Sequence, residues 1–154
     1  MAKKIKYQEG DVIAIPLQTS GYVAGLVART NKKGSAFGYF LEPKVDSVSE
    51  ICLNRKLQPK EAVLACKFGD NSVHGKAWDI IGNYPGFSKE VWKLPFFYRQ
   101  AMGDDYYSVT EYNDQLDFVR GWKIALDDLS VKDMLPDELY GSVVLQIKLT
   151  RLLG

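Results

Sequence analysis

Few residues in this chain of 154 could perform chemistry. There is one histidine, His74, and there are two cysteines, Cys52 and Cys66. A hydrolytic metal centre usually draws on several His ligands or on a set of His and carboxylates, so one histidine does not supply a His-rich site. A Ser-His-Asp triad would have to use His74, and no serine lies in a nucleophile elbow.

The cysteines and the paired acids give no stronger signal for catalysis. Both cysteines lie in apolar runs, where thiols are usually inert. The adjacent acids Asp104-Asp105 and Asp127-Asp128 lie in polar segments, where such pairs mostly solubilise a surface. Neither a phosphate-binding loop nor a dinucleotide fingerprint is present. The residues therefore supply no catalytic, cofactor or metal motif, and a small hydrolase is the third choice of function.

Length and composition predict one globular domain over residues 1–154. A chain of this size buries roughly 70% of the surface that its unfolded form exposes. The basic first residues are not followed by an apolar segment of the kind found in signal peptides. No stretch approaches the roughly 18 apolar residues that span a bilayer. We therefore expect a cytoplasmic protein without a membrane partner.

The first half of the sequence is typical of a small curved β-sheet. Two apolar runs flank a polar turn at 18–21, which predicts a strand–turn–strand unit. Gly25 and Gly38 fall inside predicted strands, where glycine indicates sharp bends. The predicted strands are 11–17, 22–30, 36–41, 61–69 and 76–81. We expect an α+β fold of mostly antiparallel strands, with an SH3-like partly open barrel in the N-terminal half.

The second half predicts a sheet extension with one or two short helices. Residues 83–105 form an aromatic-rich loop, and 106–112 alternate as a strand does. Leu116, Val119 and Lys123 share one face of a helix predicted over 114–129, although Gly121 weakens it. Alternation over 143–149 predicts a last strand. A further short helix could be capped by Ser47 or Ser49.

Charge is distributed unevenly along the chain. Residues 1–77 hold 12 Lys or Arg and 7 Asp or Glu, whereas residues 78–154 hold 8 and 12. Within 104–138 there are 10 acids and 3 bases, a balance of −7. Such a local field can steer a basic partner. A solvated surface without a partner is the alternative.

Several segments, in this order, resemble the immunity protein 26 family of bacterial polymorphic toxin systems. They are 10–17 with 22–27, Trp78-Asp79-Ile80-Ile81-Gly82, Trp92-Lys93-Leu94-Pro95-Phe96-Phe97 with 107–109, and 141–153. The resemblance implies a small non-catalytic protein, encoded beside a cognate toxin, that binds and blocks that toxin. Since many toxins of this type are nucleases, a nuclease is the toxin class that we expect. The resemblance implies no cofactor, and the family offers no catalytic residues to transfer.

We expect the toxin to bind an acidic surface flanked by exposed aromatic side chains. Rim charges raise association rates and aromatic contacts lengthen the lifetime of a complex. The expected partner-binding residues are Asp104, Asp105, Tyr106, Glu111, Asp114, Asp117, Tyr84 and Trp92. The oligomeric state stays open.

The main alternative is a nucleic-acid-binding β-barrel. The first half supplies basic residues and aromatic rings on which bases could stack, namely Lys3, Lys4, Lys6, Arg29, Lys32, Lys33, Tyr22, Phe37 and Tyr39. The acidic second half opposes this interpretation because it would repel phosphates.

Overall fold

The computed structural model describes residues 6–154, so the predicted contributions of Lys3 and Lys4 lie outside the described residues. Its main sheet has six strands in the order β10-β4-β3-β2-β1-β5. Neighbours are antiparallel except β10 and β4, which are parallel. The strands are β1 (Asp11–Pro16), β2 (Tyr22–Thr30), β3 (Ser35–Val45), β4 (Ala62–Gly69), β5 (Asp79–Asn83) and β10 (Leu139–Tyr140).

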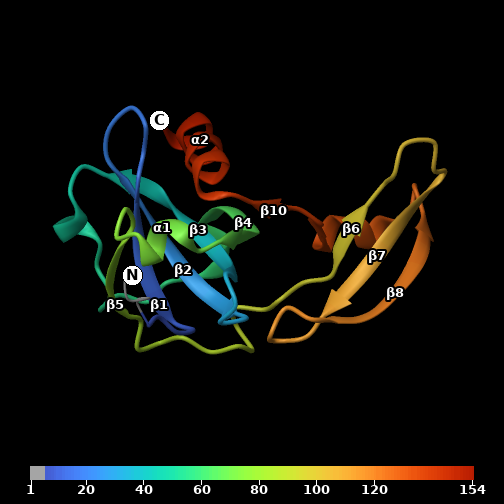
Figure 1. Cartoon of the computed structure of the whole chain (residues 1–154), viewed down its shortest axis with the longest axis horizontal. Coiled ribbons are helices and arrows are strands. Elements are labelled where there is room, and N and C mark those ends of the chain that lie inside the picture. The colour runs from blue at the N-terminus through green and yellow to red at the C-terminus, as the bar shows by residue number, and fades with distance from the viewer. Residues whose placement is uncertain (1–5) are drawn as a thin grey trace.

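A second sheet of four strands lies to one side of the main sheet (Figure 1). Its order is β8-β7-β6-β9, and its strands are β6 (Phe97–Arg99), β7 (Tyr106–Tyr112), β8 (Phe118–Ala125) and β9 (Leu135–Pro136). We call this sheet with its connecting loops, residues 97–136, the arm. The end of the arm formed by the β6–β7 loop and the end of β8 is farthest from the main sheet (Figure 1).

Two α-helices accompany the sheets, α1 (Asn71–His74) and α2 (Ser142–Leu153). Short 3-10 helices occupy Val48–Glu50, Pro59–Glu61 and Leu129–Asp133. Ser47 is the N-cap of the first of these, as the sequence predicts. Neither α-helix in the described part of the chain is long and apolar enough to cross a bilayer.

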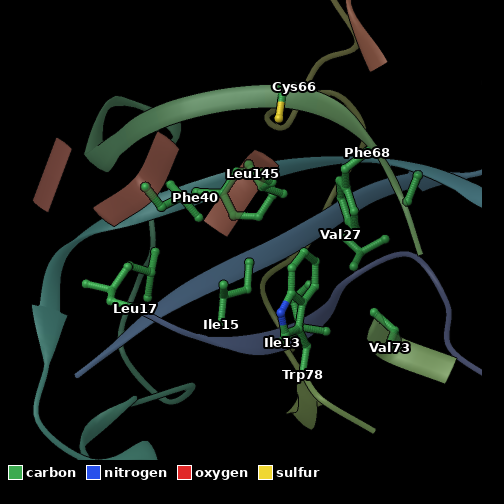
Figure 2. Packing of buried hydrophobic residues seen from close by; sticks show 13 residues of the cluster. Ile13, Ile15, Leu17, Val27, Phe40, Cys66, Phe68, Val73, Trp78 and Leu145 are labelled. Carbon is green, nitrogen blue, oxygen red and sulfur yellow. The ribbon is translucent and has the colours of Figure 1, made fainter. Parts of the chain in front are cut away.

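The main sheet is buried on both faces, which explains the continuous apolar runs of β1 and β2. One face packs Ile13, Ile15 and Val27 against Phe68 and Leu145 (Figure 2). The other face packs a second cluster that reaches the arm through Phe97. The members of this second cluster include Val12, Leu26, Phe37, Leu41, Tyr84 and Trp92.

The predicted fold class is confirmed: the chain is β-rich, mostly antiparallel and partly open. The edge strands β5 and β10 do not pair with each other, so no barrel closes in the described residues. The strand–turn–strand prediction is also confirmed. The Leu17 N–H donates to the Gly21 carbonyl at 2.9 Å, and Gly21 takes a φ of 82°.

The predicted helix over 114–129 is wrong, because this segment forms the β7–β8 turn and β8. The Asn113 side chain accepts hydrogen bonds from the backbone N–H groups of Gln115 and Asp117, both at 3.0 Å. Leu116 then adopts a φ of 61°, which is outside the helical region. A local side-chain turn therefore overrides the helical spacing of the apolar residues.

The predicted strand over 143–149 is also wrong, because this segment lies in α2. Leu145 and Leu149 are four residues apart, so in a helix they share one face. Both are buried in the cluster that covers the main sheet. Two-residue alternation and this four-residue spacing coexist in the sequence, and tertiary packing selects the helix.

Candidate functional site

Asp104, Asp105 and Tyr106 lie at the far end of the arm. Tyr106 begins β7 and pairs with Ala125, the last residue of β8. This pairing places 104–105 and 126–128 at the same end of the hairpin (Figure 1). We call residues 100–105 and 126–128 the tip. It carries Asp104, Asp105, Asp127 and Asp128, which the sequence separates by more than 20 positions.

The acids of the tip differ in whether their carboxylates accept hydrogen bonds from other residues. Asp105 is exposed, and no salt bridge joins Asp104 or Asp105 to another residue within 6–154. Asp128 instead accepts hydrogen bonds from the backbone and side chain of Ser130 at 2.9 and 2.7 Å, and these bonds lower its pKa. The tip thus presents negative charge that no described cation neutralises.

Asp114, from the same predicted set, joins the arm to the main sheet. Its Oδ1 accepts from Arg29 Nε at 2.8 Å, and its Oδ2 accepts from Lys89 Nζ at 3.2 Å. The hydrogen bond from Arg29 is the main reason why the pKa of Asp114 is lowered. Arg29 is only 3% exposed and also donates to the carbonyls of Ala28 and Trp92. Asp114 is therefore occupied by a structural role.

Glu111 and Asp117 complete the predicted acids. Glu111 Oε1 accepts from Arg120 Nε at 3.0 Å across the β7–β8 ladder, so its charge is paired. Asp117 is exposed in the turn at the base of the hairpin. The structure thus separates the six acidic and aromatic candidates of 104–117 into two groups at opposite ends of the arm.

A second charged junction fixes the arm through β4. Lys67 Nζ lies 2.5 Å from Asp137 Oδ1 and 4.1 Å from the ring centre of Tyr112. The Tyr112 hydroxyl donates to Asp137 Oδ2 at 2.9 Å. Burial, followed by the Asp137 carboxylate, raises the pKa of Tyr112. Two junctions at the arm's base, one through Asp114 and one through Tyr112 and Asp137, hold it in a defined orientation.

The expectation that Tyr84 and Trp92 are exposed is wrong. Trp92 is 0% exposed and Tyr84 is 5% exposed, and both pack in the second core cluster. The Tyr84 hydroxyl accepts the Leu57 N–H at 2.9 Å. The ring centre of Trp92 lies 5.1 Å from that of Tyr39 in an edge-to-face arrangement. These two side chains of the aromatic-rich loop pack on the sheet and are not available to a partner.

Sequence reasoning missed an aromatic surface on the arm itself. Tyr98, Val109 and Trp122 are cross-strand neighbours, so their side chains share one face of the sheet. Phe96 packs edge-to-face on Trp122 at 5.0 Å, and Tyr98 packs on Tyr107 at 5.3 Å. We call Phe96, Tyr98, Tyr107 and Trp122 the aromatic face. Alternation along 118–125 was the signal, but the helical interpretation concealed it.

His74 lies in a polar cleft elsewhere, beside the N-terminal segment. Its Nε2 is 3.1 Å from Asp70 Oδ2, and the Tyr7 hydroxyl donates to the same oxygen at 2.5 Å. Asp70 is buried, and Lys6 and Lys32 also line the cleft. No group of three or more His, Cys, Asp or Glu side chains in residues 6–154 is placed to hold a metal ion.

The stacking surface that a nucleic-acid-binding barrel would need is not formed as predicted. Phe37 is fully buried, and Arg29 is committed to Asp114. The Tyr39 hydroxyl donates to the Lys93 carbonyl at 2.5 Å, and its ring packs on Trp92. Of the residues described, Tyr22, Lys6, Lys32 and Lys33 remain accessible. Tyr22 is the one aromatic residue among these four, so they do not provide neighbouring rings on which successive bases could stack.

Comparison with known proteins identifies one family. A family model described as immunity protein 26 matches residues 8–108, about two thirds of the chain. The matched range runs from the start of the main sheet into β7, so β8 and α2 lie beyond it. No match was found among curated proteins or among solved structures.

Proposed function

Because the chain belongs to the immunity protein 26 family, we propose that it binds a cognate bacterial toxin and neutralises it by covering the toxin's working surface. The family match carries this proposal, and it implies a protein partner. Inhibition by binding requires a preformed surface and no catalytic group. The encounter would take place in the bacterial cytoplasm, where the toxin would otherwise act.

The arm is the proposed binding element. Its base is fixed by Asp114 with Arg29 and Lys89, and by Lys67 with Asp137. A surface held in one orientation before binding loses less conformational entropy when the complex forms. The aromatic face supplies large amphipathic rings, a residue type enriched at protein interfaces. The tip supplies negative charge at the end of the arm that is farthest from the main sheet.

The charge of the tip suggests the class of toxin. Asp104, Asp105 and Asp127 form no salt bridge with other described residues. Unpaired rim charges accelerate association with an oppositely charged partner. The active surfaces of nucleases are basic because they bind phosphates. We therefore propose a nuclease toxin, with the tip facing its basic cleft.

Direct binding and protection test this function together. The resemblance implies that the toxin is encoded beside this chain, so the candidate toxin is the protein encoded immediately upstream. The probe is the C-terminal domain of that protein, purified and titrated with the full chain in a calorimeter. The proposal predicts a 1:1 complex and loss of the domain's toxicity when both are expressed in one cell. Absence of a complex, with toxicity unchanged by co-expression, would contradict it.

A further inference from the structure

We propose that the free edge of β8 is a strand-pairing site, on which an extended segment of the toxin adds a fifth strand to the arm. This inference rests on the proposed function and specifies how the partner is held. An added strand would gain backbone hydrogen bonds along the edge, and side-chain contacts at alternate positions would give specificity.

The first observation is the length of this edge. β8 is the end strand of its sheet and has eight residues. The other end strands of the two sheets are shorter: β5 has five residues, and β9 and β10 have two each. Very short edge strands protect a sheet against pairing with other chains. Among the end strands described, β8 is the longest, so it offers the most backbone to a pairing strand.

The second observation is the exposure of β8. Most of its residues are exposed, including Phe118 at 67% and Val119 at 49%. In an antiparallel pair, every second residue directs its N–H and C=O away from the neighbouring strand. About half of the backbone polar groups of β8 are therefore free to pair with another strand. Phe118, Val119 and Trp122 would give that strand apolar neighbours.

The pattern of charge along the edge indicates the occupant. Acids flank β8 at Asp117 and Asp127, whereas Arg120 and Lys123 lie near its centre. A complementary antiparallel strand has basic residues at both ends and a neutral or acidic centre. Basic residues at both ends of the toxin strand agree with a toxin whose active surface binds phosphates. This partner is therefore an extended, apolar-centred segment with basic residues at its ends.

A second copy of this chain fits the edge less well. Every second residue of β8 directs its N–H and C=O toward the free edge, so two antiparallel copies of β8 pair residues that are both even-numbered or both odd-numbered. In the register centred on Trp122, Asp117 of one copy lies opposite Asp127 of the other, and like charges directly opposite each other destabilise a strand pair. In the register centred on Gly121, Asp117 lies opposite Ala125, so the flanking acids gain no directly opposite basic partner. The toxin strand is thus favoured over self-association.

Amide hydrogen exchange by NMR tests the proposal on the full chain, free and mixed with the C-terminal domain encoded immediately upstream. In the free protein, every second amide of 118–125 should exchange fast. Binding should slow these outward amides at least about tenfold and leave the amides paired with β7 unchanged, since only opened amides exchange. A complex that forms without slowing them would overturn strand pairing and leave the proposed function standing. Absence of a complex would overturn both.

Proline substitution provides the matched test. Lys123 and Ile124 are adjacent, so one of them directs its N–H outward, and the free-state exchange identifies which. Proline at that position removes an outward donor without breaking the β7 ladder. It should weaken binding at least about tenfold, whereas alanine at the same position keeps the N–H and most of the affinity. Equal affinities would overturn the proposal, as would outward amides that become protected at high concentration without the toxin domain.

Discussion

Arg29 Nε donates a hydrogen bond to Asp114 Oδ1 at 2.8 Å, and this contact joins a buried side chain near the end of β2 to the base of the arm. The two residues are 85 positions apart in sequence. Arg29 is almost fully buried, whereas Asp114 is partly exposed. The pair therefore makes the orientation of the arm depend on one buried cation and its counter-ion.

Asp114→Ala should lower the free energy of unfolding by about 1–3 kcal/mol, because it leaves a buried guanidinium without its carboxylate. Urea unfolding followed by tryptophan fluorescence measures the change. Asp117→Ala is the control, since Asp117 is exposed in the same turn and forms no salt bridge with a described residue. It should change stability by less than about 0.5 kcal/mol. Equal effects of the two variants would show that the Arg29 contact is not a structural junction.

The Arg29–Asp114 pair should make the stability of the folded protein decrease in acid. Contact with Arg29 lowers the pKa of Asp114 in the folded protein. The contribution of this ion pair to the free energy of unfolding is therefore fully present above the ordinary aspartate pKa of about 3.9. The stability difference between the natural protein and Asp114→Asn should be constant at neutral pH. It should shrink as the pH falls below about 4, through the folded-state pKa. A difference that grows in acid would contradict this assignment.

Trp92 and Tyr84 should affect stability and not the binding surface. Trp92→Ala should lower the free energy of unfolding by about 3–5 kcal/mol because the ring is fully buried. Urea unfolding measures this loss, and a loss below about 1 kcal/mol would contradict a structural role for Trp92.

Tyr84→Phe leaves the buried Leu57 N–H without its acceptor and should lower the free energy of unfolding by about 1–3 kcal/mol. Folded Tyr84→Phe protein should bind the toxin domain with unchanged affinity. A large loss of affinity without loss of stability would return Tyr84 to the interface.

The two cysteines should react at different rates. Cys52 is exposed, whereas Cys66 is buried in the first core cluster, where burial raises the pKa of its thiol. Thiolates react with iodoacetamide, so the folded protein should take up one label, at Cys52. In denaturant both should react, as intact mass and peptide mapping would show. Two labels on the folded protein would indicate that the β4 region opens readily.

The N-terminal half could be predicted from sequence because its signals are local. Apolar runs around 18–21 and the turn at Gly21 specify β1 and β2 without distant contacts. The arm could not be predicted in this way. β8 needs the Asn113 turn and the β7 ladder, and α2 needs the sheet that buries Leu145 and Leu149.

The candidate site was predicted in part. Its acidic charge follows from the sequence, but the sequence does not show which acids are paired. Asp114 and Glu111 are paired with Arg29 and Arg120, and residues that distant cannot be matched by spacing alone. Burial of Trp92 likewise depends on how a long loop folds back onto the sheet. The aromatic face was missed because Trp122 falls in the segment interpreted as a helix.

The association rate of the full chain with the upstream-encoded C-terminal domain, measured at several salt concentrations, tests the central claim most directly. The test variant is Asp104→Asn with Asp105→Asn at the tip. The control is Asp46→Asn with Asp79→Asn, two exposed acids on the main body with the same change in net charge. Steering by the tip predicts that only the test variant associates more slowly, by about tenfold at low salt, with a flatter salt dependence. Equal rates for the natural protein and both variants would contradict binding that is steered by the tip.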